Sequence, residues 1–347
     1  MSMKSLLAAT ISTLLVTSTL ADACSRVLAV GPDKMVITGR SMDWFTPLHT
    51  NLWAFPRGIK REGAAGPNSI TWTSSHGSVM AAAFDGATSD GMNDAGLVVN
   101  LLYLSDTDYG QRDAARPGLS LSMWAQYPLD NFATVEEAVR ALSVEPFQVV
   151  DLPLPGGGSP TMHLSLSDAT GDSAIIEYIK GKITIHHSRD YKVMTNEPPF
   201  DQQLALNAYW TDVGGSTFLP GTDRPADRFV RASYYLGQTP KTSDRRQAVA
   251  VMFSIIRNVS VPMGVEKPGR PNIAPTLWRT VSDQIHRDYY FEAVDNPNEF
   301  WVALDKLDLK EGAPIKKLDL SNGRILEGEA SAAFQPAVAF TFLPAGS

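Results

Sequence analysis

Cysteine is almost absent from this sequence of 347 residues, which contains only Cys24. A single cysteine excludes an internal disulfide, so the fold must depend on its core rather than on cross-links. Long apolar runs are also missing, because no stretch approaches the ~20 residues that a membrane-spanning helix needs. Lysine and arginine do not cluster anywhere, and the net charge is −7. The sequence therefore predicts no membrane span and offers no cationic surface to nucleic acid.

What is present is the composition of an ordinary globular chain, 44% hydrophobic and 19% charged. No linker rich in proline, glycine or serine divides it, and no charge run marks a boundary. Although the length would allow two domains, we expect residues 24–347 to form a single domain.

The first 23 residues have the pattern of a cleaved export signal. Lys4 provides a positive start, residues 6–16 form a short apolar run, and the Ala-Asp-Ala tripeptide at 21–23 matches the small residues that precede a cleavage point. We therefore expect a periplasmic or secreted mature chain that begins at Cys24.

Cleavage at this point would give Cys24 an unusual chemistry. Its thiol would lie beside a free α-amino group, whose pKa of ~7.7–8.0 makes it a competent base near neutral pH. Nucleophile and base would then belong to one residue. Two alternatives remain: a buried cysteine that only packs as a small hydrophobe, and a lipoprotein cysteine. The second is disfavoured because Ala21 stands where lipoprotein processing uses a leucine-like residue.

A hairpin is predicted at this new N-terminus, where two β-type runs flank the Gly-Pro-Asp-Lys turn at 31–34. If the first and last turn residues pair, Arg40 lies opposite Ser25, and Asp43 arrives close to Cys24. A nearby cation favours the thiolate, and a nearby carboxylate orients the ammonium group. Strict alternation would place Arg40 and Asp43 on opposite faces, so the strand must end or bulge between them. Without the cysteine, a surface ion pair at a hairpin end would explain these charges equally well.

The mature start, CSRVLAVGPDKMVITGRSMDW, resembles the choloylglycine hydrolase and penicillin V acylase family of N-terminal nucleophile hydrolases. In that family, arginine follows the cysteine after sixteen residues and aspartate follows it after nineteen, as Arg40 and Asp43 follow Cys24 here. Three later segments resemble the family too: DGMNDAGLVVNLLY, VMTNEPPF and LPGTDRPADRFVR. They place Tyr103 on the oxyanion-hole and substrate-side position, Asn196 on the oxyanion-hole asparagine, and Arg228 on the last active-site arginine. The export signal and the short interval before Arg228 resemble the Gram-negative branch.

The pattern of apolar residues agrees with an α+β fold of alternating strand and helix runs. Helices are predicted at 119–129, 134–142, 200–210, 225–236 and 243–259, with a capping box at Thr134 and Glu137. Strands are predicted at 162–168, 172–180, 182–188, 191–195, 277–284, 289–294, 300–305 and 338–343, the first four forming a meander that ends at Asn196. The family resemblance sharpens this fold to a four-layer αββα sandwich and implies a homotetramer.

Other catalytic chemistries find less support in the sequence. The six histidines show no zinc-ligand spacing, and His186 and His187 would point to opposite sides of a strand. The sequence context of papain-like cysteine proteases is absent, and no G-x-S-x-G elbow occurs for a serine hydrolase.

The resemblance implies an amidase for a small N-acyl amide that needs no metal or organic cofactor. Cys24 would attack the carbonyl and form an acyl-thioester, Asn196 and the Tyr103 backbone N–H would stabilise the oxyanion, and Asp43, Arg40 and Arg228 would set the charges. Penicillin V or an N-acyl homoserine lactone ranks first as substrate, because Tyr103 is the residue of penicillin V acylases. A conjugated bile salt ranks second. A catalytically silent exported binding protein with the same fold is the alternative from another class.

Overall fold

The computed structural model describes residues 24–153, 160–265 and 274–346. The predicted export signal, residues 1–23, lies outside the described residues. Among those that are described, no helix combines the length and the apolar character that crossing a membrane requires.

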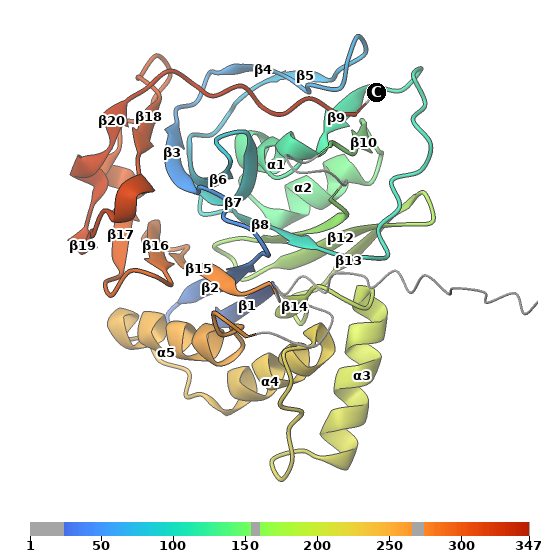
Figure 1. Ribbon diagram of the computed structural model, residues 1–347, viewed down its shortest axis with the longest axis vertical. Helices are drawn as coiled ribbons and strands as arrows, with labels where there is room; N and C mark the ends of the chain where they lie inside the picture. Colours follow the sequence, from blue (N-terminus) through green and yellow to red (C-terminus); the bar gives the residue numbers. More distant parts are fainter. Residues whose placement is uncertain (1–23, 154–159, 266–273, 347) are drawn as a thin grey trace, which may run out of the picture.

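Two large, mostly antiparallel sheets form the centre of the molecule (Figure 1). The seven-stranded sheet has the order β14 (Val193–Thr195), β1 (Ser25–Val30), β2 (Val36–Asp43), β15 (Thr276–Asp283), β16 (Asp288–Ala293), β17 (Phe300–Ala303) and β19 (Gly328–Glu329). The nine-stranded sheet has the order β13 (Lys182–His187), β12 (Ser173–Ile179), β11 (Met162–Ser167), β8 (Val98–Tyr103), β7 (Ala87–Asn93), β6 (Ser78–Ala83), β3 (Asn51–Phe55), β18 (Lys316–Leu318) and β20 (Gln335–Pro336). Two small sheets join β4 (Lys60–Glu62) to β5 (Thr71–Thr73) and β9 (Gly118–Ser120) to β10 (Gln148–Val150).

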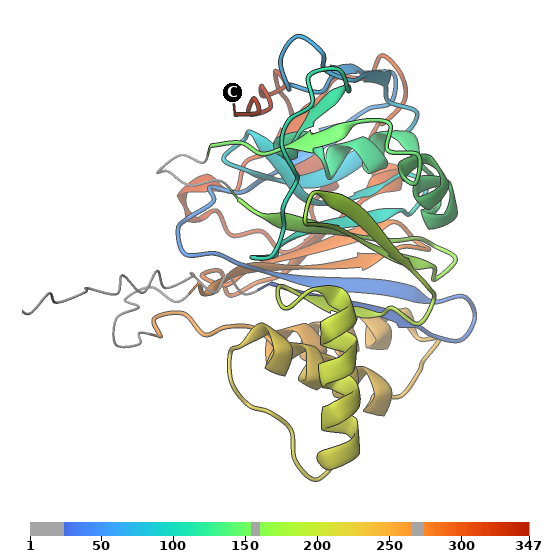
Figure 2. The ribbon, with the colours of Figure 1, turned by 90° about the vertical axis from the view of Figure 1, so that its right-hand side faces the viewer.

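Helices cover the outer face of each large sheet, which gives the four-layer αββα sandwich that the family resemblance implies (Figures 1 and 2). On the seven-stranded side, α4 (Pro225–Gln238) and α5 (Arg245–Asn258) pack on β1, and α3 (Phe200–Val213) packs beside α4. On the other side lie α1 (Gln126–Asn131) and α2 (Val135–Leu142). Short 3-10 turns occur at η1 (Leu121–Met123), η2 (Leu304–Lys306), η3 (Ser321–Gly323) and η4 (Ser331–Ala333).

Strand β2 shows how sequence and layers fit together, because all eight of its residues are buried. Its odd-numbered side faces the helices: a side chain on Gly39 would lie 2.6 Å from Met252 Cγ of α5, so only glycine allows this close approach. Its even-numbered side faces the other large sheet, where Thr38 bonds to Ser167 of β11 at 2.8 Å. Arg40 therefore points into the layer between the two sheets.

The hairpin loop between β1 and β2 is one residue longer than the sequence analysis predicts. Gly31 donates its N–H to the carbonyl of Met35 at 2.8 Å, and Arg40 consequently pairs with Arg26 rather than with Ser25. The reason is Pro32, whose ring fixes a negative φ, whereas two-residue hairpin loops need a positive φ at that position. The predicted end or bulge of this strand between Arg40 and Asp43 does not occur. β2 continues to Asp43, and the two side chains lie on opposite faces, Arg40 towards Asp90 of the other sheet and Asp43 towards Arg228 of α4. The register shift in the pairing with β15 lies on β15, between Thr276 and Trp278.

Three other predicted elements need correction. The strand 193–195 does not continue the meander β11–β12–β13 but crosses to the other sheet and pairs with β1. The predicted helix 119–129 divides into β9, η1 and the start of α1. The predicted strand 338–343 is extended but is not part of a sheet; it packs through aromatic contacts, with the Phe340 ring 5.1 Å from that of Trp53. The capping box of Thr134 and Glu137 is confirmed at the start of α2.

Candidate active site

Cys24 directly precedes β1, and only 1% of its surface is exposed. Its nitrogen donates a hydrogen bond to Asn196 Oδ1, and its carbonyl oxygen accepts one from Arg228 Nη1 at 2.6 Å. Because both backbone groups are held, the direction of the Cys24 side chain is fixed.

The sulfur of Cys24 lies in a polar environment supplied by β2. The Asp43 N–H points at Sγ from 3.5 Å, and Arg40 Nη2 lies 3.8 Å from it. Burial raises the pKa of the thiol, and the charge of Arg40 is the strongest influence in the opposite direction, while the charge of Asp43 raises this pKa further. Arg40 is thus the main group that favours the thiolate.

The carboxylate of Asp43 is completely buried and is held by neighbouring hydroxyls. Thr276 donates to Oδ1 at 2.5 Å, Ser41 donates to Oδ2 at 3.5 Å, and Arg228 Nη1 lies 3.9 Å from Oδ2. Burial raises the pKa of Asp43 to about 7, against the opposing charge of Arg228. This carboxyl group therefore titrates in the neutral range.

Arg228 and Asn196 connect three elements around Cys24. Arg228, in the first turns of α4, donates to Ser25 Oγ at 2.6 Å and to Asn196 Oδ1 at 2.8 Å. Asn196 follows β14, and its Nδ2 donates to the carbonyl of Tyr103 at 2.9 Å, at the end of β8 in the other sheet. The amide of Asn196 thus bridges the two sheets beside the cysteine.

The thiol opens into an apolar cavity that encloses about 610 Å³ when its open mouth is included. Side chains from seven parts of the chain contribute to its wall: Met42, Trp44, Leu48, Ala83, Phe84, Ala87, Leu101, Tyr103, Leu121, Leu152, Met162 and Leu343. Such a wall suits the acyl part of a substrate, because it offers dispersion contacts and no charge.

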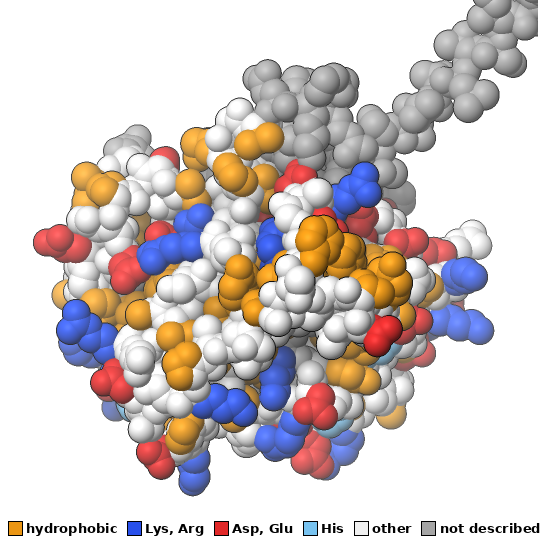
Figure 3. All heavy atoms as spheres, turned by 90° about the horizontal axis from the view of Figure 1, so that it is seen from below, with side chains coloured by type: hydrophobic (Ala, Val, Ile, Leu, Met, Phe, Trp, Pro, Cys, Tyr) orange, Lys and Arg blue, Asp and Glu red, His pale blue; other side chains and the backbone are white. Residues whose placement is uncertain are grey.

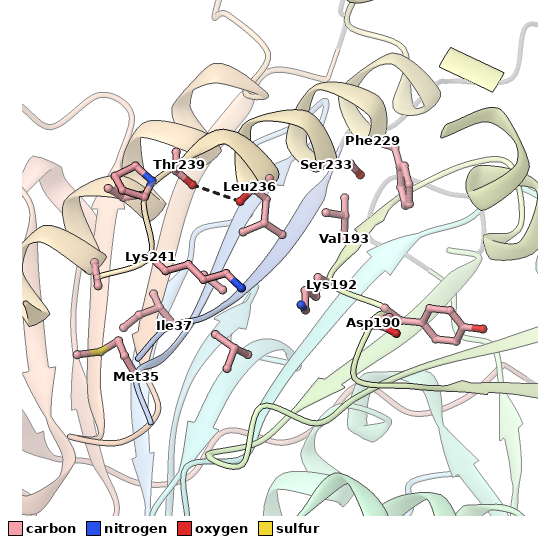
Figure 4. A pocket seen from close by; sticks show the side chains of 18 of the residues that line it. Met35, Ile37, Asp190, Lys192, Val193, Phe229, Ser233, Leu236, Thr239 and Lys241 are labelled. Atoms are coloured by element: carbon pink, nitrogen blue, oxygen red, sulfur yellow. Dashed lines mark hydrogen bonds between the residues drawn. The ribbon is translucent and has the colours of Figure 1, made fainter. Parts of the chain in front are cut away.

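A larger cavity of about 1230 Å³ by the same measure lies elsewhere, between the β1–β2 hairpin and the helices (Figure 4). Met35, Val193, Phe229 and Leu236 contribute to its walls. None of the six residues predicted for the site lines it. We therefore place the candidate site at the smaller cavity, where the only thiol of the chain lies.

Residues 24–322 match the family model described as linear amide C–N hydrolases, choloylglycine hydrolase family. The chain belongs to the choloylglycine hydrolase family. Membership makes it a hydrolase of linear amide C–N bonds.

Individual members of the choloylglycine hydrolase family show how the chain relates to proteins of named activity. It is 49% identical to a penicillin V acylase of Pectobacterium atrosepticum, over 92% of each chain. A solved penicillin V acylase from Agrobacterium tumefaciens superposes with a TM-score of 0.87 at 52% identity, covering 92% of this chain and all of the other. A bile salt hydrolase/transferase of Clostridium perfringens is more distant, at 25% identity over 84% of this chain and 95% of its own.

The structure brings together all six residues that the sequence analysis selects for the candidate site: Cys24, Arg40, Asp43, Tyr103, Asn196 and Arg228. One contact differs from expectation. The partner of the Cys24 nitrogen is Asn196 Oδ1, whereas the Asp43 carboxylate is bound by Thr276, Ser41 and Arg228.

Sequence reasoning missed three residues that complete the surroundings of the site. Thr276 binds the Asp43 carboxylate, Asp90 lies 3.5 Å from Arg40 Nη1, and Leu343 lines the cavity. Asp90 could have been selected from the sequence, because an acidic residue within an apolar strand requires a buried partner. Thr276 and Leu343 are ordinary residues in ordinary runs, so only the fold identifies them.

Proposed function

We propose that the mature protein is an exported N-terminal cysteine amidohydrolase that cleaves an apolar acyl group from an amine through an acyl-thioester. The observation that carries this proposal is the position of the only thiol, which lies 3.8 Å from a guanidinium group and lines an apolar cavity. Export and cleavage before Cys24 follow from the signal-like residues 1–23, and the family match begins at residue 24.

Cleavage would convert the Cys24 nitrogen into an α-amine without moving it. A neutral amine that donates one N–H to Asn196 Oδ1 keeps its lone pair, which accepts the thiol proton and later delivers it to the leaving amine. The thiolate attacks the carbonyl carbon, the C–N bond breaks in the tetrahedral intermediate, and water hydrolyses the resulting thioester. Asn196 Nδ2 and the backbone N–H of Tyr103 are the proposed oxyanion donors, worth roughly 3–4 kcal/mol each in comparable sites.

The cavity supports a purely apolar acyl group over a hydroxylated one. Four residues with hydroxyl groups line it: Thr88, Ser89, Tyr103 and Ser122. Three of these hydroxyls already donate to the protein: Thr88 to Gln126, Ser89 to the Ala81 carbonyl and Ser122 to the Leu343 carbonyl. A buried substrate hydroxyl could still donate to one of these three oxygens, but its own oxygen would receive no proton from them, at a cost of about 1–3 kcal/mol. We therefore place the phenoxyacetyl group of penicillin V, or the acyl chain of an N-acyl homoserine lactone, ahead of a bile acid.

Hydrolysis assays on penicillin V, an N-acyl homoserine lactone and a glycine-conjugated bile salt test this proposal. We expect native protein to hydrolyse one of the first two and Cys24→Ala to hydrolyse none. Preference for the bile salt would support the alternative substrate, and inactivity of native protein on all three would support a silent binding protein. Activity retained by Cys24→Ala would contradict the mechanism.

The homotetramer implied by the family resemblance is part of this proposal. Apolar side chains are exposed near the end of α3 and after it: Tyr209 at 59%, Val213 at 55% and Phe218 at 62%. These residues belong to the layer of α3, α4 and α5. Figure 3 views the molecule from this side and shows apolar side chains among charged ones. Burying such side chains would support an assembly, and sedimentation of the purified protein measures its size.

A further inference from the structure

We propose that Asp90, a carboxylate on β7, is a positioning residue that holds the Arg40 guanidinium against the sulfur of Cys24. Asp90 Oδ2 lies 3.5 Å from Arg40 Nη1, and both side chains are completely buried between the sheets. The other end of the same guanidinium, Nη2, lies 3.8 Å from Cys24 Sγ. The proposal rests on the proposed nucleophilic role of Cys24.

Arg40 needs such an anchor because its other contacts leave its position underdetermined. Nη2 donates to the Leu101 carbonyl at 2.9 Å and to Met42 Sδ at 3.3 Å, and the guanidinium carbon lies 4.6 Å from the centre of the Trp278 ring. Among the described residues, Nε and Nη1 find no hydrogen-bond partner. The attraction of Asp90 is therefore what compensates this end of a buried cation.

Asp90 is itself fixed by donors from both sheets. Asn100 of β8 donates to Oδ2 at 2.6 Å, while Tyr289 of β16 and Thr280 of β15 donate to Oδ1, the latter at 3.3 Å. Burial and the charge of Asp90 raise the pKa of Tyr289 well above its ordinary value, so its hydroxyl remains a donor. A carboxylate held on three sides makes a rigid support for the guanidinium.

This support matters for reactivity because few charges face the thiol. They are Arg40 and Asp43 of β2 and Arg228 of α4. Arg40 in turn faces Asp90 and Tyr289, and it pairs across the hairpin with the buried Arg26. If Arg40 moves away from the sulfur, the thiolate loses the charge that stabilises it most, and the pKa of the Cys24 thiol rises.

Two roles for Asp90 predict opposite results, which makes the inference decidable. A negative charge that acted directly on the sulfur would disfavour the thiolate, so its removal would lower the thiol pKa. A residue that acts by holding Arg40 in place does the reverse, so its removal raises the thiol pKa.

The variant Asp90→Asn removes the charge and preserves the shape of the side chain. We expect the pH profile of iodoacetamide alkylation of Cys24 to shift to higher pH by about one unit, which means about tenfold less thiolate at a given pH. Asp90 does not line the cavity, so kcat should fall about tenfold while KM changes little. An unchanged profile, or a shift to lower pH, would overturn the proposal.

A double-mutant cycle tests whether Asp90 acts through Arg40. In an Arg40→Ala background, Asp90→Asn should cause no further shift in the alkylation profile. A second shift of the same size would overturn the proposal, because it would show an effect that does not need the guanidinium.

Asp130→Asn is the matched control for the loss of a buried carboxylate. Asp130 is also completely buried and binds a guanidinium, that of Arg61 at 3.0 Å, but it lies on α1 away from the cysteine. It should change stability and leave the alkylation profile unchanged; a shift equal to that of Asp90→Asn would overturn the proposal.

Should Asp90→Asn not fold, Tyr289→Phe decides the matter, since it removes a single donor to Asp90. A smaller shift to higher pH supports the proposal, and an unchanged profile overturns it. Alkylation reports on the thiol whether or not Cys24 is the nucleophile, whereas activity retained by Cys24→Ala would contradict only the proposed function.

Discussion

At the scale of single residues, Asp43 is buried, whereas its proposed role beside Cys24 requires the charged carboxylate. Its carboxyl group is completely buried beside Cys24, where burial raises its pKa to about 7. Arg228 and Thr276 oppose this rise but do not cancel it. A group kept there in its charged form lowers stability, a cost that proteins accept at functional sites.

This cost makes a prediction about stability and pH. The ordinary pKa of the Asp43 carboxyl is 3.8, and burial raises it to about 7. Between these values the folded chain holds a proton that the unfolded chain has released, so stability falls as pH rises from about 4 to 7. Asp43→Asn removes this dependence. Urea unfolding of the full-length chain should show the variant gaining stability relative to native protein as pH rises from 4.5 to 8.

The control for the loss of one charge is Asp305→Asn, on an exposed residue of η2. Its stability difference from native protein should stay nearly constant over the same pH range. A constant difference for Asp43→Asn as well would show that this carboxyl group is not buried in its charged form.

The residues that sequence analysis could find were those with rare chemistry in a fixed order. Cys24 was identifiable because it is unique and follows a cleavage pattern, and Arg40 and Asp43 because their intervals from it match a family. The partner of the Cys24 nitrogen was not identifiable in this way. It depends on β14 crossing to the sheet of β1, which places Asn196 rather than the Asp43 carboxylate at hydrogen-bond distance.

At the scale of secondary structure, the contact between β2 and α5 depends on Gly39. A β-carbon there would approach Met252 Cγ to 2.6 Å and Ile256 Cγ1 to 2.8 Å, so Gly39→Ala must displace the helix or its side chains. We expect a loss of about 1–3 kcal/mol in the free energy of unfolding, measured with urea. Activity should fall as well, because the same strand carries Arg40 and Asp43.

Gly237→Ala on α4 is the matched control, since no atom lies within 4 Å of a β-carbon there. Alanine is favoured over glycine inside a helix, so this variant should be as stable as native protein or more stable. Equal destabilisation by both substitutions would contradict the role assigned to Gly39.

Some strand and helix positions were predicted, but strands β3, β6, β7 and β8 of the nine-stranded sheet were missed, and so were the connections between elements. The alternation of apolar residues identifies β11, β12 and β13, and helical periodicity identifies α4 and α5. The register of β1 against β2 depends instead on the backbone of one loop, where Asp33 and Lys34 both adopt positive φ values. Because β2 is buried on both faces, its apolar pattern does not exclude the neighbouring register, and the proline in the loop decides between the two.

At the scale of the whole molecule, the proposed mechanism requires that the chain be cut before Cys24. Protein that keeps any residue ahead of Cys24 should fold but hydrolyse no substrate, since its nitrogen is then a peptide amide without a basic lone pair. Intact mass identifies the first residue, and hydrolysis of the preferred substrate by cut and uncut protein measures the effect. Equal turnover by the two forms would contradict the amine base.

The four-layer architecture could be predicted from the sequence only through its resemblance to a known family. Periodicity indicates α+β, whereas the stacking of the two sheets depends on contacts between distant segments, such as that of Thr38 with Ser167. Nothing in the run of residues 338–343 distinguishes a strand from the extended segment that it forms over Trp53.

That extended segment has a consequence for the order in which the protein is made. Leu343 lines the cavity beside Cys24, and its carbonyl accepts hydrogen bonds from Ser120 at 2.8 Å and Ser122 at 2.7 Å. The ribosome adds Cys24 more than three hundred residues before Leu343. A growing chain that has not yet reached Leu343 therefore carries the thiol beside an incomplete cavity, and the proposed acyl site is complete only after the segment around Leu343 has emerged and docked.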